Sequence, residues 1–184
     1  LAHEDCAVIE KYLTSPSDSI DTKATVINAA VANGMDVSLE FVVRNILPVA
    51  GNENTLSILD AYCSKKLVDD DVFRILNFAC ACKDSKTAVV ALDCLKRGNQ
   101  YVLVPSKTVI AMLSERDLTA SDKISILDKL FEFKVEAKSV EAVMTNYLCF
   151  NQDPVATRKE VILYLLDKSP QLPTSTVQNY VLKC

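Results

Sequence analysis

The feature that most constrains the fold is a set of helix-start signals that returns at a nearly fixed interval. The first set recurs at intervals of 33, 35, 33 and 36 residues and comprises Ser38, Asp71, Ser106, Ser139 and Ser175. The second set lies between its members at intervals of 32, 35 and 34 residues and comprises Asn52, Asp84, Thr119 and Asp153. Ser, Thr, Asp and Asn are the residues that cap helix N-termini. Two alternating sets therefore predict two helices in each repeat.

A Leu-Asp pair repeats in phase with these signals. Its copies lie 33, 35 and 39 residues apart, at Leu59-Asp60, Leu92-Asp93, Leu127-Asp128 and Leu166-Asp167. Self-similarity at a period of roughly 20 to 50 residues is typical of solenoids. The longer last step predicts a final helix extended by about one turn, to Ser169, before Pro170 and Pro173 end it.

Apolar residues at spacings of three and four fill the segments between the capping signals, and no segment requires a strand. The predicted helix pairs are 4–13 with 18–31, 38–49 with 52–66, 70–82 with 85–97, 106–116 with 120–133, and 139–150 with 154–168. We expect an all-α, right-handed α-solenoid of about five helix-turn-helix repeats of 33–36 residues. It forms one segment over 1–184, as part of a longer repeat protein.

The chain opens with Leu1, and 175–184 is predicted to start a further helix. The apolar face of that helix (Val177, Tyr180, Val181) needs a partner, either in a longer parent protein or in a hairpin that this helix caps. Gly34 and Gly98 are expected just past helix ends as left-handed caps. The predicted core comprises Val42, Ile46, Ile58, Leu59, Ile75, Leu76, Ala88, Leu92, Leu127, Leu130, Val143, Leu148, Ile162 and Leu165.

Charge and composition limit the classes of function. The net charge of −4 argues against a chain that mainly coats phosphate backbones. No apolar run approaches the roughly 20 residues that cross a bilayer, so no membrane span is expected. The seven cysteines are scattered within apolar segments, which predicts reduced, buried thiols in an intracellular, reducing compartment, either the cytoplasm or the mitochondrion.

One segment resembles the pentatricopeptide family, and the period resembles both that family and the tetratricopeptide family. The residues Ala88-Val89-Val90-Ala91-Leu92-Asp93-Cys94-Leu95-Lys96-Arg97-Gly98 are similar to the second helix and exit of a pentatricopeptide motif. The resemblance implies a surface of first helices that binds single-stranded RNA, typically in an organelle. The positions that read bases in that family are mostly apolar here, and Lys123 stands where the family prefers Ala.

Polar residues near the centres of the first helices are the candidate site. Asn45, Asn77, Asn146 and Asn179 recur there, with Ser114 at the matching place in the fourth repeat. Asn is a poor mid-helix residue, so the recurrence predicts either a polar ladder along a groove or side chains that satisfy nearby backbone groups. The groups expected to line the groove are Arg44, Asn45, Arg74, Asn77, Ser114, Thr145, Asn146 and Asn179.

Catalysis is not predicted. The only histidine, His3, lies at the start of the chain, and the sequence has no glycine-rich loop for a phosphate. The thiols of Cys80 and Cys82 should point to different faces of one helix, so no metal or other cofactor is expected. We expect a non-catalytic scaffold for protein–protein assembly, with a protein partner or neighbouring repeats of the same chain. The alternative is single-stranded RNA binding in organellar RNA metabolism.

Overall fold

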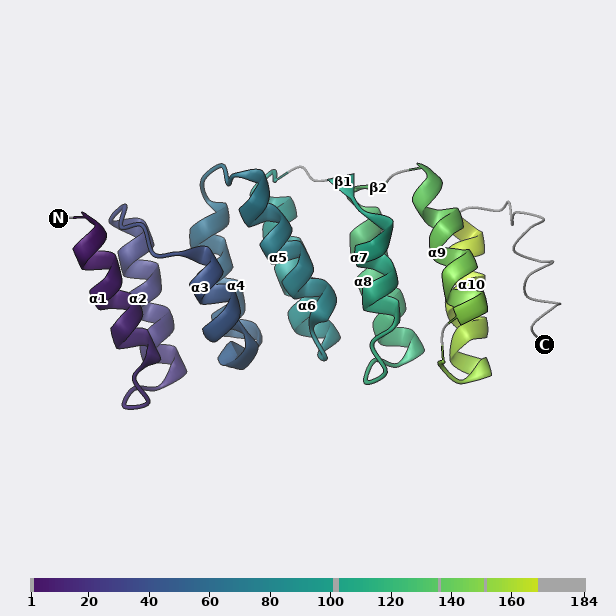
Figure 1. Cartoon of the computed structure of the whole chain (residues 1–184), viewed down its shortest axis with the longest axis horizontal. Helices are drawn as coiled ribbons and strands as arrows, with labels where there is room; N and C mark the ends of the chain where they lie inside the picture. Colours follow the sequence, from purple (N-terminus) through teal and green to yellow (C-terminus); the bar gives the residue numbers. More distant parts are fainter. Residues whose placement is uncertain (1, 101–102, 136, 151, 169–184) are drawn as a thin grey trace. The chain divides into compact units, whose positions relative to one another are not determined.

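The fold is all-helical in a computed structural model that describes residues 2–100, 103–135, 137–150 and 152–168. It contains ten helices and two strands of two residues within this part of the chain (Figure 1). The chain divides into two compact units. Unit 1 comprises 1–82 with 86–100, and unit 2 comprises 83–85 with 101–184. The prediction of a single segment over 1–184 stays a prediction.

Unit 1 is a series of antiparallel helices. They are α1 (Ala2–Thr14), α2 (Ile20–Ala32), α3 (Leu39–Asn45), α4 (Leu47–Cys63), α5 (Asp69–Ala81) and α6 (Ser85–Arg97), whose first residue falls in unit 2. Helix α4 is interrupted at Gly51, which has φ 69° and ψ 174°. Its regular part therefore begins at Asn52, where the sequence predicted a helix start.

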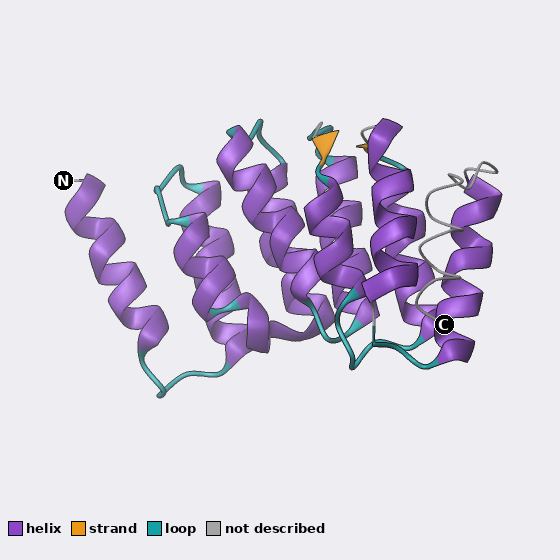
Figure 2. Cartoon of the chain, turned by 45° about the vertical axis from the view of Figure 1, so that its right-hand side comes forward, coloured by secondary structure: helices purple, strands orange, loops and turns teal. Residues whose placement is uncertain are grey.

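Unit 2 contains the remaining elements. They are β1 (Leu103–Val104), α7 (Ser106–Leu113), α8 (Ala120–Phe131), β2 (Lys134–Val135), α9 (Ala137–Phe150) and α10 (Val155–Lys168). The two strands are parallel, with Leu103 opposite Lys134 and Val104 opposite Val135, and they are minor beside the helices (Figure 2). The helix predicted over 175–184 lies outside the described residues.

The main helix contacts within each unit join the two helices of a hairpin or the matching helices of successive hairpins. In unit 1, α3 packs against α4 and α5, and α2 packs against α4. In unit 2, α7 packs against α8 and α9, and α10 packs against α8 and α9. First helices thus contact first helices, and second helices contact second helices.

The core forms along these contacts, largely as the apolar spacing predicted. Thirteen of the fourteen predicted core residues are buried, among them Val42, Ile75 and Leu92 at 0 % exposure. Leu148 is half-buried. An aliphatic residue two positions before a first helix is also buried in front of α3, α5 and α7, at Val37, Leu67 and Val104. The loops between hairpins therefore contribute to the core as well.

The capping signals locate the starts of the helices better than they identify the residues that cap them. Ser38 and Thr119 do cap α3 and α8, through the backbone N–H groups of Phe41 and Asp122. Asp71, Ser106 and Ser139, however, lie inside the first turns of α5, α7 and α9. When tertiary contacts fix the start of a helix at or before such a residue, the residue lies in the first turn instead of capping it.

The two glycines expected as left-handed caps differ in their roles. Gly34 has φ 74° and follows α2, while Met35 N–H donates to the Ala30 carbonyl at 3.0 Å, as in a Schellman cap. After α6 the left-handed residue is Asn99, at φ 51°, so the prediction for Gly98 is wrong. Gly98 is needed for another reason. A Cβ there would press on the Cys63 carbonyl oxygen and stand 2.9 Å from the Cys63 Cβ.

Candidate interaction surface

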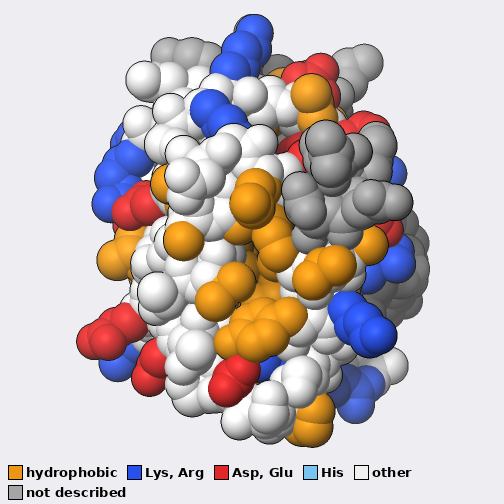
Figure 3. All heavy atoms as spheres, turned by 90° about the vertical axis from the view of Figure 1, so that its left-hand side faces the viewer, with side chains coloured by type: hydrophobic (Ala, Val, Ile, Leu, Met, Phe, Trp, Pro, Cys, Tyr) orange, Lys and Arg blue, Asp and Glu red, His pale blue; other side chains and the backbone are white. Residues whose placement is uncertain are grey.

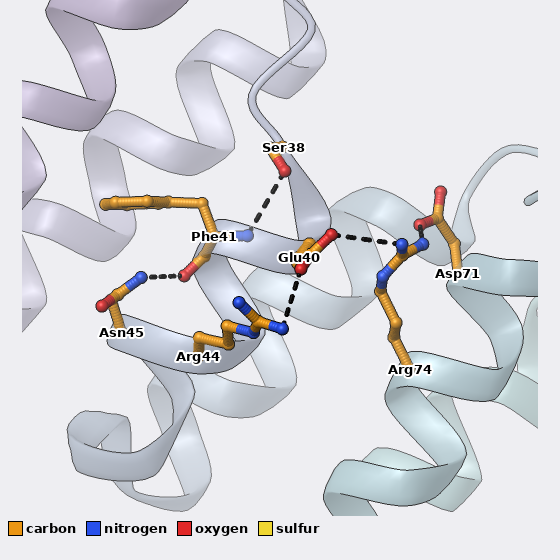
Figure 4. A network of polar contacts seen from close by, with 7 residues as sticks. All are labelled: Ser38, Glu40, Phe41, Arg44, Asn45, Asp71 and Arg74. Carbon is orange, nitrogen blue, oxygen red and sulfur yellow. Dashed lines mark hydrogen bonds and ion pairs between the residues drawn. The ribbon is translucent and has the colours of Figure 1, made fainter.

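Charged side chains of α3 and α5 form a connected network on unit 1 (Figure 4). The two carboxylate oxygens of Glu40 accept from different arginines, Arg44 at 3.0 Å and Arg74 at 3.2 Å. Arg74 also donates to Asp71 Oδ1 at 2.9 Å. One carboxylate thus holds an arginine of its own helix and an arginine of the next first helix.

The local sequence explains how this network is built. Ser38 starts α3, which places Glu40 in the first turn and Arg44 one turn later on the same face. Asp71 and Arg74 stand in the same relation at spacing three on α5. Because α3 packs against α5, Arg74 reaches back to Glu40, which lies 34 residues earlier.

The network is electrically balanced, because two arginines face two carboxylates. Its members differ in exposure: the Arg44 side chain is 74 % exposed and that of Arg74 is 35 % exposed. An exposed ion pair at spacing four contributes about 0.3–0.5 kcal/mol. Arg44 is therefore held weakly, whereas Arg74 is fixed by two carboxylates.

The structure places the other predicted groove residues on two units. In unit 1, Asn45 and Asn77 are exposed on the adjacent helices α3 and α5. In unit 2, Ser114 is exposed and directly follows α7, while Thr145 and Asn146 are half-buried on α9. Asn179 lies outside the described residues. The structure therefore brings together Arg44, Asn45, Arg74 and Asn77 on two neighbouring helices.

Two of these residues satisfy backbone groups of their own helices. The Asn45 side-chain amide donates to the Phe41 carbonyl at 2.9 Å, and the Ser114 hydroxyl donates to the Ile110 carbonyl at 2.8 Å. At these two positions the contacts favour the interpretation in which the polar side chain satisfies a nearby backbone group. One of the two N–H donors of the Asn45 amide is thereby occupied, so the residue offers its second N–H and its amide oxygen to a partner.

A buried charged cluster in unit 2 was missed by sequence reasoning. Lys123 of α8 is 0 % exposed, and its ammonium donates to the Asp153 carboxylate and to the Leu113 carbonyl. The Tyr147 hydroxyl of α9 donates to the same Asp153 oxygen at 2.6 Å. Burial and the neighbouring carboxylate raise the pKa of Tyr147, so its hydroxyl stays a donor. Lys123 follows the buried Ala120 by three residues and so lies on the same face of α8. This spacing is the signal that could have indicated the burial of Lys123.

This cluster is closed to solvent and joins four parts of unit 2. It connects α8, α9 and the segment before α10, together with the end of α7. Asp153 was predicted only as a helix-start signal, yet its carboxylate is the partner of a buried ammonium. We assign the cluster to the stability of unit 2, because a buried charge requires its partner.

Three cysteines, Cys63, Cys80 and Cys94, have the surroundings of unreactive thiols. Cys63, Cys80 and Cys94 are buried free thiols, and Cys82 is half-buried. Burial raises the pKa of Cys63, of Cys80 and of Cys94 to about 12. Thiols of this kind remain protonated near neutral pH and are poor nucleophiles.

The described residues contain no group of three or more His, Cys, Asp or Glu side chains that could hold a metal ion. Among them, no helix has both the length and the apolar character that a bilayer crossing needs.

Apolar side chains gather on the face of unit 1 that carries α1 and α2 (Figure 3). Val8 of α1 is 68 % exposed. Contiguous apolar surface of this kind is typical of a face that packs against another protein element.

Comparison with known proteins yields no relative. No protein-family model matches the chain, and no curated protein or solved structure gives a significant match. The architecture therefore rests on the helices and contacts described above. The resemblance to pentatricopeptide and tetratricopeptide repeats remains a hypothesis.

Proposed function

We propose that this chain is a non-catalytic α-solenoid of about five helix-turn-helix repeats that mediates protein–protein assembly within a larger protein or complex. The observation that carries the proposal is that polar contacts join residues one sequence period apart. Asn54 donates to Asp21 across 33 residues in unit 1, and Tyr164 donates to Asp128 across 36 residues in unit 2. Contacts between successive repeats are what stabilise a solenoid.

The surface chemistry favours a protein partner over RNA. RNA binding needs cations for phosphates and planar groups for stacking. The arginines on α3 and α5 are both paired with carboxylates, so this face adds no net positive charge. The apolar face over α1 and α2 supports the same proposal, with a protein partner or neighbouring repeats of the same chain as the occupant (Figure 3).

The deciding experiment compares two kinds of ligand on the same protein. Labelled single-stranded RNA is titrated at two salt concentrations against wild type and against Arg44→Ala/Arg74→Ala. In parallel, a display library of random linear peptides is selected on the wild type. We expect selected peptides that bind saturably and no salt-dependent RNA binding. Tight RNA binding that weakens steeply with salt, and further on loss of the arginines, would establish the RNA function instead.

A further inference from the structure

The loop between α2 and α3 begins with a chemically labile pair of residues. Asn33 is followed directly by Gly34, and the sequence contains no other Asn-Gly step. In such a step the backbone nitrogen of the glycine attacks the side-chain carbonyl carbon of the asparagine and expels ammonia, which leaves a cyclic succinimide. Water then opens the ring to aspartate or isoaspartate. Glycine favours the attack because it has no Cβ beside the attacking nitrogen.

The surroundings of this step do not hinder the reaction. Asn33 and Gly34 are both exposed, and a Cβ built on Gly34 would have no atom within 4 Å. Asn28 of the same helix differs in both respects, because it is half-buried and is followed by Ala29. The two asparagines therefore offer a comparison within one helix.

The folded end of α2 nevertheless keeps the reacting atoms apart. Asn33 has ψ 10°, whereas ring closure requires the Gly34 nitrogen to turn to the side of the Asn33 Cβ about the Cα–C bond. The Gly34 N–H donates to the Val31 carbonyl at 3.1 Å. The Asn33 side-chain amide donates to the Ala29 carbonyl at 2.7 Å. Both hydrogen bonds must break before the nitrogen reaches the side-chain carbon.

We propose that Asn33 is a deamidation site at which the opening of the last turn of α2 sets the rate. Helix ends fray, and every residue from Ala32 to Asp36 is exposed, so this turn opens without exposing buried side chains. The reaction consumes one water molecule and releases one ammonia molecule. It therefore requires no oxidant, cofactor or enzyme.

The product alters the connection from α2 to α3. Isoaspartate routes the main chain through the former side chain and so adds a methylene group before Gly34. Further along the loop, Val37 is buried, and its carbonyl accepts from the Tyr62 hydroxyl at 2.9 Å. Either product also places a carboxylate at the negative end of the α2 macrodipole. Deamidation should therefore weaken the join between these two helices.

The test incubates the full chain at physiological temperature in neutral buffer, with and without denaturing urea. The tryptic peptide 24–44 contains both Asn28 and Asn33, so mass spectrometry compares the two residues within one peptide. In the folded chain we expect deamidation at Asn33 to be at least tenfold faster than at Asn28. It should be at least tenfold slower than at Asn33 in urea. An aspartate-specific protease distinguishes the products, because it does not cleave at isoaspartate.

Ala32→Gly tests the opening step in the folded chain. Ala32 is exposed in the last turn of α2, so glycine removes no packing there, and its lower helix propensity should raise the rate about fivefold. Ala111→Gly is the matched control, because Ala111 is an exposed alanine of α7 in unit 2. It should leave the rate at Asn33 within twofold of wild type.

Three results would overturn the proposal. Equal rates at Asn33 and Asn28 in the folded chain would show that the Asn-Gly step is not a preferred site. Equal rates at Asn33 with and without urea would show that the end of α2 does not restrain the reaction. An unchanged rate in Ala32→Gly, or an equal rise in Ala32→Gly and Ala111→Gly, would show that opening of this turn does not set the rate.

Discussion

Unit 1 and unit 2 are both built from helix hairpins, but they join their hairpins by different chemistry. In unit 1 the buried polar link is neutral: the Gln100 amide accepts from Leu67 N–H at 3.1 Å and donates to the Lys65 carbonyl at 2.9 Å. In unit 2 the buried link is charged and joins Lys123 to Asp153. A neutral link tolerates the loss of a group better than a charged one, because an unpaired buried charge costs several kcal/mol. The spacing of the helix-start signals alone therefore does not determine how firmly a hairpin is fixed.

The largest effect should come from Lys123→Ala in unit 2. This change leaves the buried Asp153 carboxylate without its ammonium and opens a cavity, so we expect a loss of about 3–5 kcal/mol in the free energy of unfolding. Chemical denaturation followed by circular dichroism measures it. Lys129→Ala is the control, because Lys129 is partly exposed on the same helix and should cost less than about 0.5 kcal/mol.

Removing both charges distinguishes the contribution of the ion pair to stability from the contribution of side-chain packing. Lys123→Met/Asp153→Leu should recover part of the loss, since apolar residues of similar volume often replace a buried pair without penalty. The recovery is incomplete because the Tyr147 hydroxyl loses its acceptor. A double variant less stable than Lys123→Ala would contradict this account of the cluster.

The close approach in unit 1 predicts the next largest effect. Gly98→Ala places a Cβ against the Cys63 backbone, and we expect a loss of about 2–3 kcal/mol in unfolding free energy. Gly34→Ala is the matched control, because Gly34 has a positive φ and no atom within 4 Å of its added Cβ. It should cost only the backbone strain, about 1 kcal/mol. Equal losses in the two variants would show that the contact with Cys63 does not restrict position 98.

The pH dependence of unit 2 gives a smaller effect. Hydrogen bonds from Ser85 and then Thr119 hold the pKa of the Asp122 carboxyl below its usual value. The stabilisation is present above the unfolded pKa of about 3.9 and is lost as the pH falls through the lower folded value. The stability gap between wild type and Asp122→Asn should therefore narrow between pH 5 and about pH 2. A gap that stays constant over this range would rule out the hydrogen-bonded carboxylate as its cause.

Helix positions and the core could be predicted from the sequence because both depend on local spacing. The apolar positions of Ile58, Leu92 and Leu127 fix the buried faces, and the structure confirms them. Contacts between neighbouring hairpins could not be predicted in the same way. Whether Gly98 caps a helix or approaches Cys63, and whether Lys123 faces solvent or Asp153, depends on how the helices pack. The candidate arginines were predicted to line a groove, but their shared partner Glu40 follows only from the contact of α3 with α5.

The smallest effects concern the network of Figure 4, and they test whether its two arginines differ as their contacts indicate. Arg74 joins two helices through Glu40 and Asp71, so Arg74→Ala should cost about 1 kcal/mol in unfolding free energy. Arg44 pairs within its own helix and is largely exposed, so Arg44→Ala should cost less than about 0.5 kcal/mol. When Glu40→Ala is also present, the loss of unfolding free energy caused by Arg74→Ala should shrink. The loss caused by Arg44→Ala should hardly change. A double-mutant cycle measured at low and at high salt checks this, since screening weakens exposed pairs most. Equal coupling of both arginines to Glu40 would mean that Arg44 is held as firmly as Arg74 despite its greater exposure.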